Sequence, residues 1–131
     1  MIIGVPKEIK TQEHRVGLLP SAVYQLVKHG HQVVVERGAG IDAGYPDEDY
    51  TAAGAKLVDS HEEAFRVDFI VKVKEPVAGE YAFLRKDQIL FTYLHLAANL
   101  DLTAALLKSG AAAIAYETRS EEHTSELQSP C

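Results

Sequence analysis

Short runs of apolar, largely β-branched residues recur along this chain, and amphipathic or turn-forming segments separate them. Strands that are buried on both faces form continuous apolar runs, and consecutive parallel strands need a crossover connection, usually a helix. The alternation therefore predicts an α/β fold, a doubly wound, mostly parallel sheet of about six strands with helices on both faces. The expected strands are 2–5, 33–35, 56–58, 69–74, 88–93 and 112–116.

Capping and turn residues mark the helices between these strands. Ser21 is expected to cap a helix that Gly30 ends, and the acidic residues after Pro46 favour a short helix that Gly54 ends. Ser60 begins the pattern of a capping box. The remaining helices are expected at 80–84 and 102–107.

Composition bounds the size of the protein and its partners. The 131 residues are 47% hydrophobic, which suffices for one core and about one domain. The net charge is −6 and no basic run occurs, which argues against nucleic-acid and anionic-membrane partners. No apolar run approaches a membrane span, and residues 1–6 lack the pattern of a signal peptide. We therefore expect a cytoplasmic protein.

The composition changes abruptly at Arg119, where a polar segment follows an apolar run. Residues 119–129 match the translation, in one reading frame, of a common adapter for short-read sequencing libraries. We therefore expect residues 119–131 to be a non-native, disordered tail and residues 1–118 to form the folded domain. A natural polar tail is the alternative, which resequencing of the locus would test. The one cysteine, Cys131, lies in this segment, so it indicates no redox compartment.

Three residues that could carry chemistry lie at or beyond the carboxyl ends of predicted strands. Arg15 follows the first strand, Lys74 ends the fourth, and His95 follows the fifth. Ligands of parallel α/β sheets bind at this edge, so we expect the three side chains to lie near one another. Lys72 is on the same strand as Lys74 but farther from its carboxyl end, which favours Lys74.

Each of these residues also has an ordinary structural interpretation. Arg15 could be a solvated loop charge, and His95 could be a hydrogen-bonded histidine within an apolar run. Lys74 could form an ion pair with Glu8 or Glu75. The shared edge of the sheet is what favours a functional role for all three.

A glycine-rich stretch, 38–44, follows the second predicted strand. Its third glycine is one position later than a dinucleotide-binding fingerprint requires, and residues 44–46 would break the helix that should begin at the second glycine. We therefore predict a loop that needs glycine dihedrals, and no cofactor-binding residue in this chain. The histidines have no metal-ligand spacing, so no metal site is predicted.

Four segments go beyond generic α/β patterning: 4–8, 13–16, 71–76 and 89–98. They resemble the amino-terminal part of the NAD-dependent alanine dehydrogenases, and the likeness runs through residues 1–118. The proton-translocating nicotinamide nucleotide transhydrogenases are similar in the first two segments and in the Gly-Ala-Gly loop. They lack the Lys-Glu-Pro and Leu-His-Leu-Ala-Ala motifs, which favours the dehydrogenases.

The resemblance implies a Rossmann-like substrate domain and the reversible oxidative deamination of L-alanine to pyruvate and ammonium, with hydride passed to NAD. It assigns Arg15 and Lys74 to the substrate and His95 to proton transfer. A guanidinium can grip a carboxylate with two parallel hydrogen bonds, and an ammonium can stabilise charge on a keto oxygen. An imidazole, whose ordinary pKa is about 6.5, can exchange protons.

The resemblance also implies that residues 1–118 are an incomplete amino-terminal, substrate-binding domain. NAD would be bound by a domain absent from this chain, so that the fragment alone is inactive. It implies a homo-oligomer, a hexamer, for the full-length enzyme. Two alternatives stay open. One is a domain like the alpha subunit of a transhydrogenase, and the other is a non-catalytic α/β module that binds a small carboxylate through Arg15 and Lys74.

Overall fold

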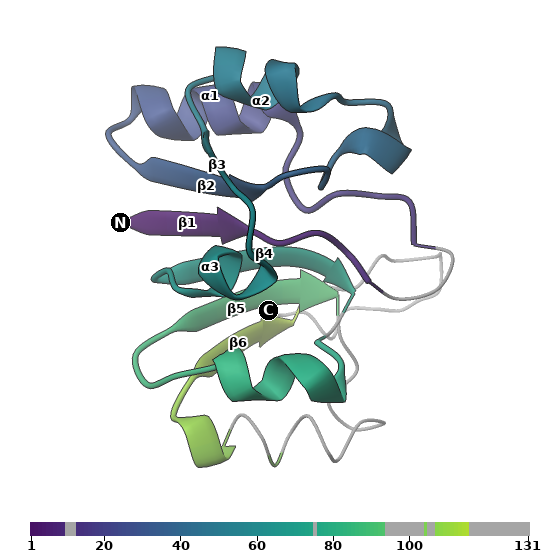
Figure 1. The fold of residues 1–131 in the computed structure, drawn as a ribbon. Helices are drawn as coiled ribbons and strands as arrows, with labels where there is room; N and C mark the ends of the chain where they lie inside the picture. The colour runs from purple at the N-terminus through teal and green to yellow at the C-terminus, as the bar shows by residue number, and fades with distance from the viewer. Residues whose placement is uncertain (10–12, 75, 94–103, 105–106, 116–131) are drawn as a thin grey trace, which may run out of the picture.

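The computed structural model describes residues 1–9, 13–74, 76–93, 104 and 107–115. In these residues six strands form one parallel sheet in the order β3-β2-β1-β4-β5-β6 (Figure 1). The strands are β1 (Ile2–Val5), β2 (Gln32–Glu36), β3 (Lys56–Val58), β4 (Phe69–Lys74), β5 (Ile89–Tyr93) and β6 (Ala112–Ala115). All five pairings are parallel, so the predicted parallel sheet of about six strands is confirmed.

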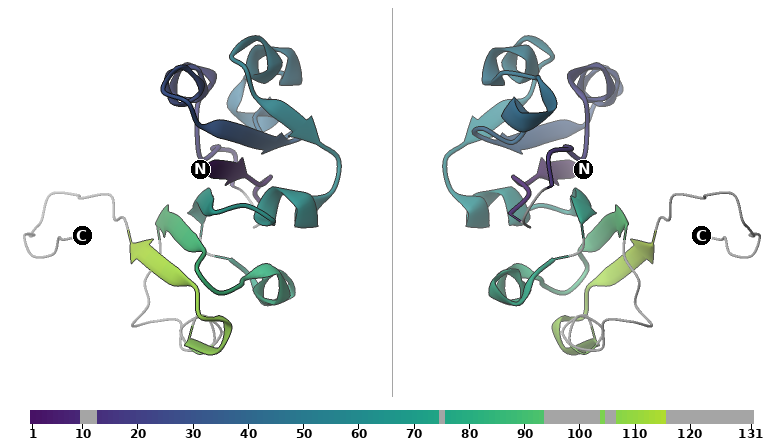
Figure 2. Two further views of the ribbon diagram at one scale, coloured as in Figure 1. Left: turned by 90° about the vertical axis from the view of Figure 1, so that its left-hand side faces the viewer. Right: turned by 90° about the vertical axis from the view of Figure 1, so that its right-hand side faces the viewer.

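Helices cover both faces of this sheet, and Figure 2 shows α1 and α3 on opposite sides of it. The α-helices are α1 (Pro20–Lys28), α2 (Asp47–Ala52) and α3 (His61–Phe65), and the 3-10 helices are η1 (Ile41–Ala43) and η2 (Ala78–Phe83). The strand order is that of Rossmann-like domains. The doubly wound architecture is therefore confirmed.

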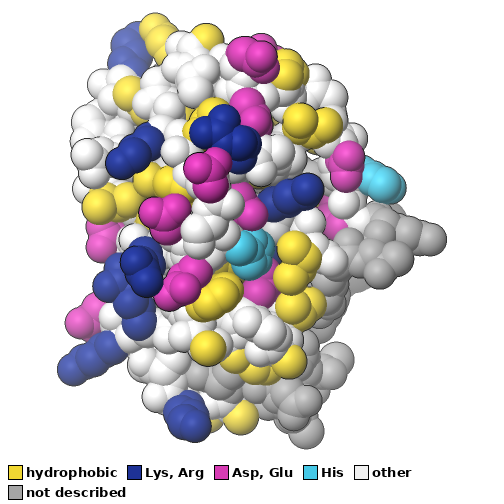
Figure 3. All heavy atoms as spheres, viewed as in Figure 1, with side chains coloured by type: hydrophobic (Ala, Val, Ile, Leu, Met, Phe, Trp, Pro, Cys, Tyr) yellow, Lys and Arg dark blue, Asp and Glu magenta, His cyan; other side chains and the backbone are white. Residues whose placement is uncertain are grey.

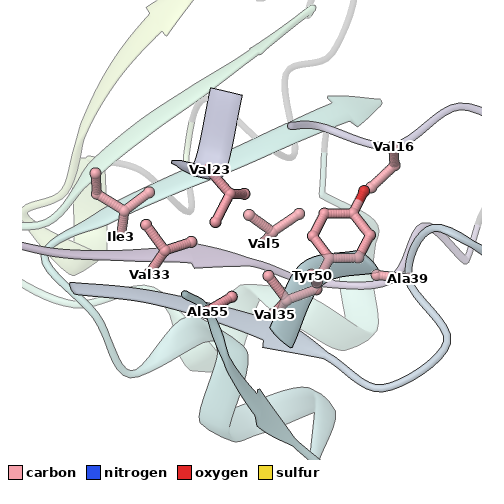
Figure 4. Packing of buried hydrophobic residues seen from close by; sticks show 9 residues of the cluster. All are labelled: Ile3, Val5, Val16, Val23, Val33, Val35, Ala39, Tyr50 and Ala55. Carbon is pink, nitrogen blue, oxygen red and sulfur yellow. The ribbon is translucent and has the colours of Figure 1, made fainter. Parts of the chain in front are cut away.

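One hydrophobic core lies between the sheet and helices α1 and α2. Its buried residues are Ile3, Val5, Val16, Val23, Val33, Val35, Ala39, Tyr50 and Ala55 (Figure 4). Alternate residues of β1 and β2 point to this face, because successive side chains of a strand point to opposite faces. Each such side chain contributes about 1.5–3 kcal/mol to folding when it is fully buried.

A second hydrophobic core lies on the other face, against α3 and η2. Its buried residues are Phe65, Val67, Ile70, Leu84 and Leu90. Gly4 allows α3 to pack directly on β1, because a Cβ at this position would collide with the carbonyl oxygen of Ala64. Most of the remaining residues of the central strands β1 and β4 are thus buried or partly buried, which is why these strands read as continuous apolar runs.

Local signals placed several helix boundaries correctly. Gly30 and Gly54, which follow α1 and α2, have positive φ angles of 95° and 102°. The hydroxyl of Ser60 caps α3 by accepting a hydrogen bond from the backbone N–H of Glu63 (3.3 Å). These positions suit glycine and serine for the reasons that the sequence suggested.

The prediction that Ser21 caps the first helix is wrong. The helix begins at Pro20, and Leu19 occupies the capping position without a side-chain hydrogen bond. Proline has no N–H to satisfy and its φ is already fixed near the helical value, so it begins a helix readily. Ser21 therefore lies inside the first turn.

Two predicted segments lie wholly or mostly outside the described residues. The helix expected at 102–107 lies mostly outside the described residues, and the segment 119–131 lies entirely outside them. In the part of the chain that the structure describes, no helix has the length and apolar character needed to cross a membrane.

Candidate functional site

The candidate site lies at the carboxyl edge of the sheet between β1 and β4. These neighbouring strands are parallel, but the chain continues from β1 toward β2 on one side and from β4 toward β5 on the other. Doubly wound sheets bind ligands at such a reversal of strand order. Only the first two residues of β4 pair with β1, which ends at Val5. The loop after β1 can therefore contact the last residues of β4.

Arg15 lies in this loop and is paired with Glu13. Its guanidinium donates from Nε to Glu13 Oε2 (3.0 Å) and from Nη2 to Oε1 (3.1 Å), and its backbone N–H donates to Oε2 (2.8 Å). The Glu13 side chain is only 3% exposed, whereas that of Arg15 is 60% exposed. A buried carboxylate thus orients a guanidinium that solvent can reach.

The charge of Lys74 also acts on the carboxylate of Glu13. Burial by itself would raise the pKa of Glu13, but the hydrogen bonds and charge of Arg15, with a smaller effect of the Lys74 charge, hold this pKa below its usual value. Of the three predicted site residues, Arg15 is thus paired with this carboxylate, and the charge of Lys74 acts on it more weakly. The structure brings them into the same region, as the shared edge predicts.

Two residues hold the Arg15 loop against the sheet. A Cβ at Gly17 would lie 2.5 Å from the carbonyl oxygen of Val71, so only glycine allows this approach to β4. The hydroxyl of Tyr50, which reaches from α2 toward the loop in Figure 4, donates to the carbonyl oxygen of Leu18 (2.7 Å). Sequence analysis did not identify either residue as part of the site.

The two lysines of β4 have different surroundings. The Lys72 side chain is 2% exposed, and its Nζ lies 3.2 Å from Glu8 Oε1 and 3.8 Å from Glu80 Oε2. Lys74 is less buried, and its backbone N–H donates to Glu8 Oε1 (3.2 Å). The ion pair with Glu8 that was considered for Lys74 is thus formed by Lys72. Of the two lysines, Lys74 is the more exposed to solvent.

A hollow of about 620 Å³ opens beside Arg15 at this edge. It is lined by Arg15, Val16, Gly17, Leu19, Ala43, Tyr45, Val71, Lys72, Val73 and Phe91. Two cationic residues among mostly apolar ones, the exposed Arg15 and the buried Lys72, suit a small molecule with one carboxylate. Lys74 is not part of this lining, but its charge acts on Glu13, which binds Arg15.

His95, the third predicted site residue, lies outside the described residues. The strand that precedes it, β5, ends at Tyr93, and the backbone of Tyr93 pairs with that of Lys74. The chain thus leaves β5 toward His95 from a point next to Lys74. A role for His95 in proton transfer stays a prediction.

A buried network of charges that the sequence did not reveal lies behind the site. His61 donates to two carboxylates, from Nδ1 to Glu36 Oε1 and from Nε2 to Glu80 Oε2, both at 2.6 Å. These hydrogen bonds raise the pKa of His61 to about 9 against the opposing effect of burial. Lys72 lies next to Glu80 and joins this network to Glu8. The signal for this network in the sequence is Lys72, a charged residue within an apolar strand.

Burial alone would raise the pKa of Glu80, but its hydrogen bond from His61 and the charge of Lys72 lower it. Glu80 Oε1 also accepts the backbone N–H of Val77 at the start of η2 (2.9 Å). The network therefore connects η2 and the beginning of α3 to β4. It is a structural support of the site rather than a second site.

The glycine-rich loop after β2 does not fit a dinucleotide. Gly38 and Gly44 have positive φ angles of 86° and 93°, which explains both glycines. A Cβ at Gly40 would lie 2.6 Å from the ring of Tyr50, so that this side chain fills the space above the loop. The helix that follows Gly40 directly is the three-residue η1, which is too short to offer an N-terminus for a pyrophosphate. The predicted loop is confirmed.

Other ligand classes find little support in the part of the chain that the structure describes. Among these residues, no group of three or more His, Cys, Asp or Glu side chains could hold a metal ion. Acidic and basic side chains are interspersed on the face shown in Figure 3, without a continuous basic patch there. The fold and the site thus define a Rossmann-like α/β domain with an exposed arginine beside a hollow at its switch point.

Comparisons with known proteins agree with this class. A family model described as "Alanine dehydrogenase/PNT, N-terminal domain" matches residues 4–129. The chain belongs to this family. The chain spans about a third of the length of the curated relatives it matches.

Among these relatives, the alanine dehydrogenase of Bacillus subtilis (strain 168) is 50% identical over 130 residues, which are 99% of this chain and 34% of that protein. The alanine dehydrogenase of Staphylococcus epidermidis (strain ATCC 12228 / FDA PCI 1200) is 53% identical over 118 residues, 90% of this chain and 32% of that protein.

Solved structures show the same relationship. An L-alanine dehydrogenase superposes with a TM-score of 0.88 at 58% identity, over 90% of this chain and 33% of that one. A transhydrogenase from Sinorhizobium meliloti superposes with a TM-score of 0.82 at 30% identity, over 88% of this chain and 34% of that one. The predicted resemblance to the alanine dehydrogenases, with the transhydrogenases as the more distant branch, is confirmed.

Proposed function

We propose that this chain is the amino-terminal, substrate-binding part of an alanine dehydrogenase. The complete enzyme would catalyse the reversible oxidative deamination of L-alanine to pyruvate and ammonium. The observation that carries the proposal is the pair of cations, Arg15 and Lys74, around Glu13 at the switch point of the sheet. A small 2-oxo acid has one carboxylate and one polar oxygen, which two such cations suit.

Each of the three residues has a distinct role in this proposal. Arg15 binds the substrate carboxylate, and its solvent-exposed guanidinium is already held in place by Glu13. Lys74 donates to the carboxylate or to the keto oxygen and stabilises charge on it. His95 accepts and returns protons while the amine is exchanged for the ketone, which contributes about 10²–10⁴-fold to the rate.

NAD would be the hydride acceptor and would be bound by a domain outside this chain, because the glycine loop does not fit it. The chain alone is then expected to be inactive. The complete enzyme is proposed to be cytoplasmic and to form a homo-oligomer, a hexamer. We further propose that residues 1–118 are the native part of this domain and that 119–131 are not. The two alignments differ by nearly the length of the tail: the one with the Bacillus protein spans 130 residues, and the one with the Staphylococcus protein spans 118. Genomic resequencing beyond codon 118 is the test of whether the tail is native.

The function can be tested by joining residues 1–118 to the part of Bacillus subtilis alanine dehydrogenase that follows the matched region. We refer to this protein as the joined enzyme. It should form NADH when L-alanine and NAD are supplied. Absence of alanine-dependent NADH formation from a folded joined enzyme would contradict the proposal, and so would such activity of the 131-residue chain alone.

Substitutions in the joined enzyme test the roles. Arg15→Ala should raise the KM for pyruvate by about 10–100-fold, as expected for the loss of hydrogen bonds between charged groups. His95→Ala should lower kcat far more than it changes KM. Arg66→Ala is the matched control, since Arg66 lies on the surface in an ion pair with Glu62 at the end of α3. Unchanged kinetics of both Arg15→Ala and His95→Ala would refute the assignment.

Titration of the 131-residue chain with pyruvate, without NADH, tests the alternative that the chain is a non-catalytic module. A module that binds small carboxylates on its own should bind pyruvate measurably and should gain no activity in the joined enzyme. A transhydrogenase-like domain, favoured by the structural match at 30% identity, should instead give hydride exchange between nicotinamide dinucleotides without a requirement for alanine.

A further inference from the structure

The end of β4 is not a regular strand. Val71 pairs with Phe91 of β5, and Lys74 pairs with Tyr93, so that three steps along β4 match two steps along β5. One extra residue of this kind is a β-bulge, which bends a strand and changes the direction of the side chains that follow it. The bulge lies immediately before Lys74.

A bulge leaves backbone groups without partners in the sheet, and here the carboxylate of Glu8 supplies the acceptor. Glu8 Oε2 accepts the N–H of Val73 (2.8 Å), and Glu8 Oε1 accepts the N–H of Lys74 (3.2 Å). In a regular strand the N–H groups of successive residues point to opposite sides, whereas these two converge on one carboxylate. Because β1 has ended before this point, its own carbonyl groups do not serve as acceptors here.

The bulge is also held from the opposite side. The hydroxyl of Thr92, on β5, donates to the carbonyl oxygen of Val73 (3.1 Å). Both the N–H and the C=O of Val73 thus have side-chain partners from neighbouring segments. The backbone from which the Lys74 side chain leaves is therefore fixed on two sides.

The charge of Glu8 is balanced within the protein. Its side chain is 3% exposed, and the equally buried Nζ of Lys72 donates to Oε1 at 3.2 Å. A buried carboxylate needs such a partner to stay ionised, and an ionised carboxylate is a stronger acceptor for two N–H groups than a neutral one. Lys72 and Glu8 thus act together on the bulge.

We propose that Glu8 is a positioning residue for Lys74: its carboxylate, neutralised by Lys72, fixes the β4 bulge and thereby aims the Lys74 side chain at the substrate. This inference rests on the proposed function, in which Lys74 contacts pyruvate. Glu8 does not itself touch the substrate in this account. Its removal should therefore affect substrate binding and catalysis indirectly, through the end of β4 that carries Lys74.

The first test is kinetic and uses the joined enzyme. Glu8→Gln replaces one acceptor oxygen with an NH2 group, which cannot accept the N–H of a backbone amide. We expect kcat/KM for pyruvate to fall by about 10–100-fold, with a raised KM, because small displacements of a catalytic group have effects of this size. Glu48→Gln is the matched control, since Glu48 is an exposed carboxylate on α2, and it should leave the kinetics unchanged.

A double variant separates positioning from general stability. Glu8→Gln alone leaves the Lys72 charge buried, whereas Glu8→Gln with Lys72→Met removes both charges and should restore much of the melting temperature. If Glu8 positions Lys74, the double variant regains stability but keeps the raised KM for pyruvate. Recovery of parental kcat/KM together with the melting temperature would overturn the proposal.

The second test does not depend on activity. Amide hydrogen exchange of the 131-residue chain should show the N–H groups of Val73 and Lys74 exchanging at least about tenfold faster in the double variant than in the parent, while Glu48→Gln leaves them unchanged. Unchanged exchange at both amides would refute the role of Glu8, whatever the kinetics. An inactive joined enzyme with the parental sequence would contradict the proposed function, and exchange would then decide the Glu8 contact by itself.

Discussion

Deprotonation of His61 should destabilise the fold as the pH is raised. Both ring nitrogens of His61 lie 2.6 Å from a carboxylate oxygen, one on Glu36 and one on Glu80. Only the charged imidazolium has two N–H groups to donate, so the neutral ring must lose one of these hydrogen bonds. The carboxylate left without its donor is largely buried in either case, which makes the loss costly.

The size of the effect follows from the pKa of His61, which rises from 6.5 to about 9 in the folded chain. A change of this size corresponds to about 3 kcal/mol if it is fully realised. The His61 side chain is 23% exposed, so solvent screening reduces the expected contribution to about 2 kcal/mol. Because the folded pKa is the higher one, this stability is fully present below about pH 6.5 and is lost as the pH rises through about 9.

Urea unfolding of the chain at a series of pH values from about 6 to about 9.5 measures this contribution. The quantity of interest is the difference in unfolding free energy between the parent and His61→Gln at each pH. This subtraction removes the other groups that titrate in the same range.

We expect the difference between the parent and His61→Gln to shrink by about 2 kcal/mol across this range. A constant difference for His61→Gln would refute the reasoning. It would mean that His61 is neutral in the folded chain at neutral pH, with one of its two carboxylate contacts not a true ion pair.

Three further predictions concern the supports of the site and the helix boundaries. Gly17→Ala should destabilise the chain by about 1–3 kcal/mol and raise the pyruvate KM of the joined enzyme, because its Cβ would collide with a β4 carbonyl oxygen. Gly79→Ala, where a Cβ meets nothing, is the control in both assays. Tyr50→Phe should cost about 1 kcal/mol in urea unfolding through loss of its hydrogen bond to the Arg15 loop; no change would deny that contact any energetic role. Ser60→Ala should lower the unfolding free energy by about 1 kcal/mol, and Ser21→Ala by much less, since only Ser60 caps a helix. Equal losses would argue against this difference.

The fold was predictable because its signals are local. A strand buried on both faces reads as an apolar run, and a helix end with a positive φ selects glycine, so both features are visible over a few residues. The order in which the strands pair is set by long crossovers, and composition does not encode it. The start of α1 shows the limit of local signals: Pro20 and Ser21 both favour a helix start, and the backbone adopted the one that proline allows.

The site was predictable only in part, for a related reason. The rule that parallel sheets bind ligands at their carboxyl edge brought Arg15 and Lys74 together without any knowledge of their contacts. The identity of their partners was not accessible. Glu8 was considered as a partner for Lys74, but it lies 64 residues from Lys72, and the pairing depends on how β1 and β4 meet. Only tertiary structure decides which of two nearby lysines a buried acid will neutralise.

Lys72 nevertheless carried a usable signal. A lysine within an apolar strand of a doubly wound sheet must be buried, and a buried ammonium requires a carboxylate nearby. A carboxylate that is buried beside this ammonium needs hydrogen-bond donors of its own. Glu80, which contacts both Lys72 and His61, is such a carboxylate. The structure satisfies the requirement of the ammonium with two carboxylates near Lys72 Nζ, those of Glu8 and Glu80. A charge at an apolar position therefore predicts a network rather than a pair, and in this chain that network supports the strand end that carries Lys74.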